Sequence, residues 1–149
     1  MRTSEAGIEQ IKAFEGFRTM PYKDTGGRLT VGYGHLMVPG DGLVEGSPIT
    51  MGQATSILKN DLQAAENCVN STGTALTQNE FDALVSFVYN LGCPDFQRST
   101  LLRFIKQQNY IAAAEEFPKW DMVDGIHSSS IRNRRLAEQA CFQHAIYKG

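Results

Sequence analysis

The 149-residue sequence contains no long run of apolar residues. Its longest apolar stretches are only a few residues, whereas a helix that crosses a bilayer needs about 20. The first residues also lack the basic and then apolar pattern of a secretory signal. We therefore expect a chain that is made in the cytoplasm without a signal peptide and does not insert stably into a membrane.

The sequence also lacks an excess of charge of either sign. Its 14 basic and 16 acidic residues give a net charge of −2, and both signs occur in both halves of the chain. A nucleic-acid-binding surface needs clustered positive charge, so we expect no nucleic-acid partner. The only basic cluster is Arg132, Arg134 and Arg135. We interpret it as a solvated or ion-paired helix face, with a local contact to an anion or a carboxylate as the alternative.

Cysteine and histidine are scarce. The cysteines are odd in number and widely spaced, which is not the pattern of a disulfide framework, so we expect each to pack in the core. They are Cys68, Cys93 and Cys141. The histidines show no spacing typical of metal ligands, and they are His35, His127 and His144. We therefore predict neither a metal nor a cofactor.

The chain does contain a clear helix pattern near its N-terminus. Ile8, Ile11 and Phe14 recur every three positions after Ser4. This spacing predicts an amphipathic helix over residues 4–16. Glu15 then lies in its last turn.

A turn and a glycine-rich strand follow this helix. Asp24 opens the turn sequence Asp-Thr-Gly-Gly, and alternating apolar residues predict a strand after it. These apolar residues are Leu29, Val31 and Tyr33. Thr30 points to the other face, where we expect an open surface. Gly32 and Gly34 weaken a strand, and the close approach of a ligand is one reason for glycine at such positions.

The remainder of the chain is helical in pattern. Two capping boxes, Thr50 with Gln53 and Thr77 with Glu80, predict helices that begin at these threonines. The first extends over about 50–70 and the second stops near Gly92, and shorter helices are expected at about 99–108, 110–117 and 130–147.

The predicted fold class is α+β and mostly helical, in a single domain that spans residues 1–149. A small β-hairpin lobe is expected at about 17–50, and a long linking helix at about 50–70 joins it to a helical lobe. That helical lobe covers about 74–149 and includes the first helix, 4–16.

Glu15 and Asp24 form a pair of carboxylates suited to the hydrolysis of a glycosidic bond. This reaction needs one acid that protonates the leaving oxygen and a second carboxylate that helps water attack. Phe14 and Phe17 give Glu15 apolar neighbours, which suit a protonated acid, whereas an Asp in a polar turn stays ionised. Thr30 can hold a water through its hydroxyl. A Glu near a helix end and an Asp in a turn are also ordinary structural features.

The segment from Glu15 to His35 resembles the phage-type lysozymes, the family of the lambdoid endolysins (glycoside hydrolase family 24). The family pattern is Glu-Gly, then Asp-Thr/Ser-x-Gly-x-x-Thr, then Gly-x-Gly-His, and its parts begin here at Glu15, Asp24 and Gly32. The segments 76–105, "AAAEEFPKW" and "IRNRRLAEQACF" resemble the helical part of the same family. The resemblance implies a lysozyme-like fold. It also implies an endo-acting muramidase that hydrolyses the β-1,4 bond between N-acetylmuramic acid and N-acetylglucosamine in bacterial peptidoglycan.

The resemblance also implies roles for individual residues. Glu15 would be the general acid, and Asp24 and Thr30 would position the attacking water in an inverting reaction. The positions that match the family's substrate cleft are Leu36, Tyr89, Asn90 and Ser99. For two of them another role is open. Ser99 could instead cap the following helix, which is the interpretation that we favour, and Tyr89 could belong to the core.

For a chain without a signal segment, the resemblance implies synthesis in the host cytoplasm, action on the cell wall in the periplasm, and dependence on a pore-forming holin. We expect a monomer. Two alternatives stay open. A lytic transglycosylase uses one Glu and no water, and Asp24 and Thr30 argue against it. A catalytically silent peptidoglycan-binding module would not need Glu15.

Overall fold

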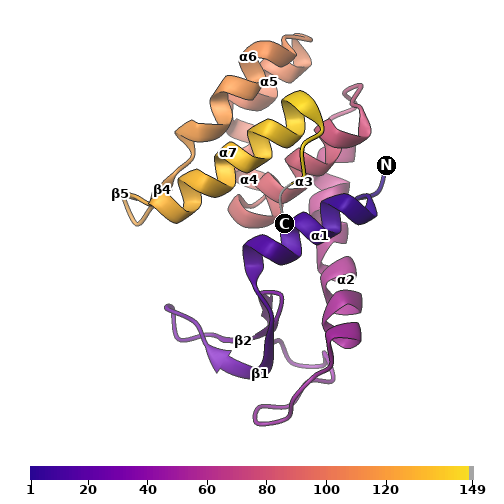
Figure 1. Ribbon diagram of the computed structural model, residues 1–149, viewed down its shortest axis with the longest axis vertical. Coiled ribbons are helices and arrows are strands. Elements are labelled where there is room, and N and C mark those ends of the chain that lie inside the picture. Colours follow the sequence, from indigo (N-terminus) through magenta and orange to yellow (C-terminus); the bar gives the residue numbers. More distant parts are fainter. Residues whose placement is uncertain (148–149) are drawn as a thin grey trace.

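The computed structural model describes residues 1–147. In Figure 1 the β1–β3 sheet lies at the lower end of the molecule, α2 rises from it, and most other helices lie above. This is the predicted mostly helical α+β fold. In chain order the elements are α1 (Glu5–Glu15), β1 (Arg18–Lys23), β2 (Leu29–Gly32), β3 (His35–Leu36), α2 (Met51–Asn70), α3 (Gln78–Leu91), α4 (Cys93–Arg98), α5 (Thr100–Lys106), α6 (Tyr110–Glu116), the 3-10 helix η1 (Phe117–Lys119), β4 (Met122–Val123), β5 (Ile126–His127) and α7 (Ser129–His144).

Helix α1 begins and ends where the sequence supplies a signal. The Ser4 side chain accepts a hydrogen bond from the backbone N–H of Gly7 at 3.1 Å, and Ile8 is buried in the core as predicted. The helix stops at Gly16, whose φ of 71° is a conformation that glycine adopts without steric cost. Glu15 is therefore the last residue of α1, directly before the chain enters the sheet.

The sheet is antiparallel in the order β1-β2-β3, so β2 is its central strand. Val31 is fully buried, as the alternation predicted. Thr30 is also buried, with only 4% of its surface exposed, and it pairs with Tyr22 on one side and Leu36 on the other. The expectation of an open surface around Thr30 is therefore met only in part: its side chain lines the cleft described below, but little of its surface is exposed.

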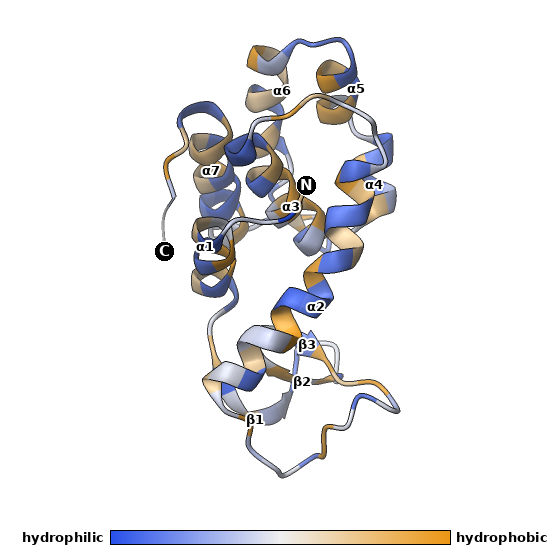
Figure 2. Cartoon of the chain, turned by 90° about the vertical axis from the view of Figure 1, so that its right-hand side faces the viewer, coloured by the Kyte–Doolittle hydropathy of each residue, from blue (hydrophilic) through white to orange (hydrophobic). Residues whose placement is uncertain are grey.

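Helix α2 joins the sheet to the helical part of the molecule. The predicted capping box is present: Thr50 accepts from the backbone of Gln53, and the Gln53 side chain accepts from the backbone of Thr50. Hydrophilic and hydrophobic residues are interspersed along the helix (Figure 2). Its buried positions recur mostly every three or four residues, which confirms the predicted apolar stripe. Its buried apolar residues are Ala54, Leu58, Leu62, Ala65, Cys68 and Val69.

Helix α3 forms the centre of the helical part. Residues 81–88 are all buried, as expected for a helix that is surrounded on every side. Helices α1, α2, α4 and α7 pack against it. Phe87 of α3 makes edge-on contacts with Phe96, Phe117 and Trp120, at centroid distances of 5.5–6.3 Å. This aromatic cluster fixes the position of the helices behind the cleft described below.

Helix α4, the 3-10 helix η1, strand β3 and the β4–β5 hairpin were not predicted from the sequence. Pro94 lies in the first turn of α4, where a missing N–H costs nothing, so it starts a helix as well as following one. The β4–β5 hairpin has strands of two residues each, which are too short to show any alternation.

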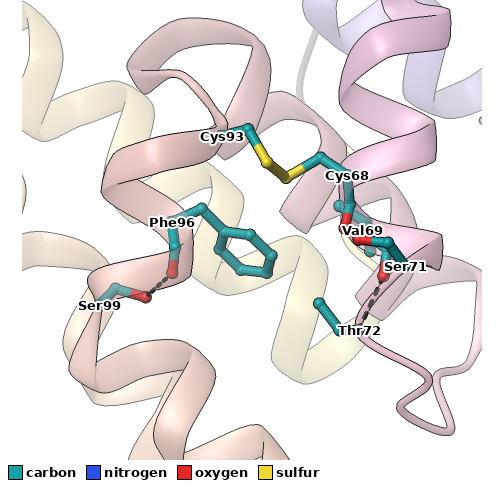
Figure 3. The surroundings of a disulfide bond; sticks show 7 residues. All are labelled: Cys68, Val69, Ser71, Thr72, Cys93, Phe96 and Ser99. Carbon is teal, nitrogen blue, oxygen red and sulfur yellow. Dashed lines mark hydrogen bonds between the residues drawn. A yellow bond between two sulfur atoms is a disulfide. The ribbon is translucent and has the colours of Figure 1, made fainter.

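The cysteines do pack in or against the core, as predicted, but the expectation that they form no disulfide is wrong for two of the three. Cys68 near the end of α2 and Cys93 at the start of α4 form a disulfide bond, with Cα atoms 6.0 Å apart (Figure 3). The two cysteines are 25 positions apart, and the segment between them leaves α2 and runs along α3. Nothing in this spacing shows that its ends meet. Cys141 is free and buried, as predicted, and burial raises the pKa of its thiol to about 12.

Candidate active site

A cleft of about 610 Å³ lies between the sheet and the helical part of the molecule. It brings together the three predicted catalytic residues, which come from the end of α1, from the β1–β2 turn and from β2. The residues that line it are Glu15, Tyr22, Asp24, Arg28, Thr30, Gly34, His35, Leu36, Val38, Asp61, Tyr89 and Asn90.

Glu15 enters the cleft from the end of α1, and 19% of its side chain is exposed. Its Oε2 accepts a hydrogen bond from Nη1 of Arg134 at 2.7 Å. Its Oε1 lies against Gly34, where an added Cβ would come within 2.7 Å of that oxygen. Gly34 therefore makes room for the Glu15 carboxylate. It also lines the cleft, so the close approach of a ligand, the reason considered from the sequence, stays a prediction.

Gly32 likewise packs against protein, because a Cβ added there would lie 3.2 Å from the Cβ of Ala54 in α2. Both glycines also have positive φ angles, 65° for Gly32 and 80° for Gly34, which L side chains rarely adopt. The glycine-rich pattern thus reflects packing of the sheet against α1 and α2.

Arg134 is the partner of Glu15, a contact that the sequence left open as an alternative. It belongs to the basic cluster, and its contact with Glu15 is the local carboxylate contact considered there. Only 7% of Arg134 is exposed, and its guanidinium also lies over the ring of Phe14, 4.8 Å from the centroid. Phe14 is thus near the carboxylate, as predicted, but the nearest partner of Glu15 is a cation.

The other two arginines of the cluster differ from each other. Arg132 is more than half exposed and lies 3.7 Å from Asp121, as expected for an ion-paired helix face. Arg135 is fully buried and donates to the side chains of Glu138 and Asn90.

Asp24 lies on the opposite side of the cleft in the turn between β1 and β2. Its Oδ1 accepts from the backbone N–H groups of Gly26 and Arg28, each at 2.9 Å. The Arg28 backbone N–H contributes most to lowering the pKa of Asp24, slight burial opposes it, and the Gly26 N–H and the Arg28 guanidinium add to the lowering. Asp24 is therefore ionised at neutral pH, as predicted.

Thr30 reaches the cleft although most of its surface is covered. Its hydroxyl donates to the backbone carbonyl of Arg28 at 3.2 Å. Lone pairs of the Thr30 oxygen stay available to accept a hydrogen bond from another group.

The structure brings three of the four predicted substrate-binding residues to the cleft. Leu36 is 41% exposed, whereas Tyr89 is largely buried and donates to the carbonyl of Tyr33 at 3.4 Å. Burial and then the nearby Glu15 carboxylate raise the pKa of the Tyr89 phenol. Asn90 accepts from Arg135.

Ser99 is the fourth, and it is not among the residues that line the cleft. Its Oγ accepts from the N–H of Leu102 at 3.1 Å, so it caps α5, which is the alternative that the sequence favoured.

A second polar group at the cleft was missed by sequence reasoning. His35 lies between two carboxylates: Nδ1 is 2.7 Å from Asp61 of α2, and Nε2 is 3.2 Å from Asp41 of the loop after β3. Burial of the ring opposes the charged form, but the hydrogen bonds to Asp61 and Asp41 outweigh it and raise the pKa of His35. The Gly-x-Gly-His motif marked the histidine, but nothing in the sequence identified its two partners.

The described residues contain neither a metal-binding cluster nor a membrane-spanning helix. No group of three or more His, Cys, Asp or Glu side chains in residues 1–147 is arranged to hold a metal ion. Over the same residues, no helix has the length and apolar character needed to cross a membrane.

Comparison with known proteins assigns the chain to a family. Residues 12–138 match the sequence pattern of the phage lysozymes. The chain belongs to the phage lysozyme family. Every residue that lines the cleft falls within the matched segment. Membership makes the chain a glycoside hydrolase of the lysozyme class, as the sequence predicted.

Individual relatives agree with this assignment. The endolysin of Bacillus phage PZA is 41% identical over 151 residues, which cover 99% of this chain and 57% of that endolysin. The chain thus spans little more than half the length of that relative. The solved endolysin of Escherichia coli phage FAHEc1 superimposes with a TM-score of 0.93 at 34% identity, covering 100% of this chain and 98% of the other. The muramidase domain of SpmX from Asticaccaulis excentricus superimposes with a TM-score of 0.86 at 35% identity, covering 95% of this chain and 97% of the other.

Proposed function

We propose that this chain is an endolysin that hydrolyses the β-1,4 bond between N-acetylmuramic acid and N-acetylglucosamine in peptidoglycan and so contributes to lysis of the host cell. One observation carries the proposal. Glu15, Asp24 and Thr30 come from three different elements and line the same cleft. The names of the relatives, endolysins and a muramidase domain, point to the same activity.

Glu15 is proposed as the general acid that protonates the leaving oxygen of the glycosidic bond. Once it has given up its proton, the carboxylate carries a negative charge next to the guanidinium of Arg134, 2.7 Å away. A charge-assisted hydrogen bond of this kind stabilises the product form of the acid. Arg134 also fixes the direction in which the carboxylate points into the cleft.

Asp24 and Thr30 are proposed to hold the attacking water. The lowered pKa of Asp24 keeps its carboxylate ionised and able to accept a proton from that water. The Thr30 hydroxyl can accept a second hydrogen bond from the same water, since its own proton is donated to Arg28. Attack by a water held on the side opposite the acid gives inversion at the anomeric carbon.

Leu36, Tyr89 and Asn90 are proposed to contact the sugars that flank the cleaved bond. Leu36 offers an exposed apolar surface at the cleft, and the ring of Tyr89 lines the opposite wall. Ser99 is not part of this proposal because its hydroxyl is used in the cap of α5.

Mass spectrometry of the fragments released from purified peptidoglycan tests the reaction. We expect the native chain to release muropeptides with reducing N-acetylmuramic acid ends and Glu15→Gln to release none. Circular dichroism should show that the variant is folded. Anhydro-ended products would replace the proposal by a lytic transglycosylase. An absence of products, together with wall binding that survives Glu15→Gln, would replace it by a binding module.

We further propose synthesis in the host cytoplasm and release to the periplasm through a holin. The proposal rests on the family relationship and on an active cleft whose substrate lies outside the cytoplasmic membrane. Expression in a bacterial host with and without a co-expressed holin tests it. Lysis that is equally fast without the holin would contradict the proposed dependence.

Residues 1–149 are proposed to form a single domain that acts as a monomer. Light scattering should give the mass of one chain, 16.5 kDa. Unfolding followed by fluorescence and by circular dichroism should give one coincident transition, and two separated transitions would contradict the single domain.

A further inference from the structure

A buried ionic group lies directly behind Glu15. It consists of Arg134, Arg135 and Glu138, all on α7, whose exposed fractions are 7%, 0% and 0%. Charged side chains are almost never fully buried unless they are paired, because removing them from water is costly. The contacts within this group therefore decide how each of its members is oriented.

Glu138 is the shared acceptor of this group. Its Oε1 accepts from Nη1 of Arg135. Its Oε2 accepts from Nε of Arg134 at 3.2 Å and from the Ser86 hydroxyl of α3 at 2.5 Å. Both oxygens of the carboxylate are thus occupied, and the side chain cannot turn without breaking contacts to two arginines.

Arg134 is held on three sides. Nε donates to Glu138 and Nη2 to the backbone carbonyl and hydroxyl of Ser86, at 3.2 and 3.3 Å. Because the guanidinium is planar and rigid, these contacts determine where the remaining nitrogen, Nη1, points. It points at Glu15. The orientation of the proposed general acid therefore depends on a residue that does not line the cleft.

The same group balances charge around the acid. Glu15 faces Arg134 from α7 and the phenol of Tyr89 from α3, and it shares the cleft with Asp24 from the sheet and Asp61 from α2. Glu138 faces the two arginines of its own helix, the Ser86 hydroxyl of α3 and the buried thiol of Cys141. Without Glu138, among the hydrogen bonds of the described residues, Arg135 would keep only the neutral oxygens of Trp120 and Asn90, and Arg134 would keep only Glu15 and Ser86.

We infer that Glu138 is a positioning residue for the reaction: it orients Arg134 on Glu15 and limits how strongly the two arginines favour the ionised form of the acid. The inference rests on the proposed role of Glu15 as general acid. Glu138 touches no substrate, and its effect is transmitted entirely through Arg134.

The variant that tests this is Glu138→Gln, which keeps the shape of the side chain and removes its charge. The uncompensated arginines should make Glu15 lose its proton at lower pH. We expect the alkaline limb of the pH–activity profile on purified peptidoglycan to move down by about one pH unit. We expect kcat at the optimum to fall about 10-fold with KM little changed. A merely structural role would lower stability and leave the limb in place.

Two variants serve as controls. Glu138→Asp keeps the charge, so the alkaline limb of its pH–activity profile should lie at the same pH as that of the native chain. Glu115→Gln removes one negative charge at an exposed position of α6 and should leave both kcat and the limb as in the native chain. A native limb and native kcat in Glu138→Gln would overturn the inference.

If Glu138→Gln does not fold, Ser86→Ala tests the same inference. This variant keeps all charges but removes the hydroxyl that holds Glu138 and Arg134, so kcat should fall about threefold or more with an unchanged limb. A native kcat would overturn the inference. Failure of the proposed function is distinguishable, because it would appear as retained hydrolysis in Glu15→Gln whatever the behaviour of the Glu138 variants.

Discussion

The sheet side of the cleft is held together by short-range hydrogen bonds, whereas the helical side depends on a buried ionic group. On the sheet side, Asp24 accepts from backbone groups two and four residues ahead, and 21% of its side chain is exposed. On the helical side, Glu15 and Arg134 are 119 residues apart in the chain. Behind them Glu138 is fully buried.

This difference in contacts suits the two sides of the cleft to different roles. A carboxylate in an exposed turn can change its contacts at little cost to the fold, so the sheet side is suited to hold a water that is consumed in every turnover. A buried arginine that loses a partner leaves an uncompensated charge in a low dielectric. If Glu15 is the acid as proposed, the helical side combines its orientation with stability of the whole fold. Substitutions on the helical side should then lower both activity and stability, and substitutions on the sheet side should lower activity alone.

The largest effect is expected from Asp24→Asn on the sheet side. Peptidoglycan hydrolysis should fall by about 10²–10⁴-fold, because the group proposed to accept the proton of the attacking water is lost. The melting temperature should change little, since the Asn oxygen still accepts from the backbone N–H groups of Gly26 and Arg28. Release of reducing ends and a thermal melt measure the two quantities.

Asp124→Asn is the matched control for this prediction. Asp124 also lies in an exposed turn, and its φ of 51° is one that Asn tolerates well. Its activity should equal that of the native chain. An Asp24→Asn variant that hydrolyses peptidoglycan as fast as this control would remove Asp24 from the proposed mechanism.

On the helical side, Arg134→Met should be strongly destabilising. It leaves Glu138 and Glu15 without a shared cation, and breaking a buried pair in this way costs about 3–5 kcal/mol. On the sheet side, Arg28→Met removes an arginine whose side chain is 66% exposed, and the loss should be below about 1 kcal/mol. Urea denaturation of both variants measures the free energy of unfolding. Equal losses would show that the two sides are not held differently after all.

The same contrast explains which parts of the site could be predicted from the sequence. The turn at Asp24 and the end of α1 at Glu15 follow from residues a few positions away, so capping, glycine and turn patterns were sufficient to place them. The resemblance to a family then supplied the chemistry. Helices α2 and α3 were predicted for the same reason, since their capping boxes and apolar stripes are local.

Contacts between distant segments could not be predicted in this way. Arg134 was recognised only as part of a basic cluster, because no pattern in one sequence shows that α7 packs against the end of α1. The disulfide between Cys68 and Cys93 and the two partners of His35 were missed for the same physical reason. The small exposed fraction of Thr30 was missed because alternation shows which residues share a face of a strand but not what packs against that face.

The disulfide provides a third test, since it ties α2 to the start of α4 beside the helical side of the cleft. Cys93 lies close to Tyr89 and Asp61, both of which also line the cleft. Removing the bond in a Cys68→Ala, Cys93→Ala variant should lower the free energy of unfolding by about 3 kcal/mol, the value for a loop of this size. Urea denaturation with and without a reductant measures it.

A reductant should destabilise the native chain and leave the double variant unchanged, which is the internal control. The kcat of the folded double variant should remain close to the native value, because no catalytic contact is removed. Native stability under reducing conditions would mean that non-covalent packing alone holds α2 and α4 together.

The smallest effect is expected at His35, which lies between a carboxylate of α2 and a carboxylate of the loop after β3. The pKa of His35 is raised in the folded state, so the folded chain binds a proton more tightly than the unfolded chain. This stabilisation is fully present below the unfolded value of about 6.5 and is lost as the pH rises through the folded pKa. The difference in melting temperature between the native chain and His35→Asn should therefore be larger at pH 5.5 than at pH 8.5.

Asp61→Asn gives the control, because it removes the closer of the two carboxylates at 2.7 Å. In that background the effect of His35→Asn should depend much less on pH. If the native chain and His35→Asn differ by the same amount at both pH values, the histidine contributes only neutral hydrogen bonds. The loop after β3 would then be held on α2 by packing, and the sheet side of the cleft would contain no pH-dependent contact with the helices.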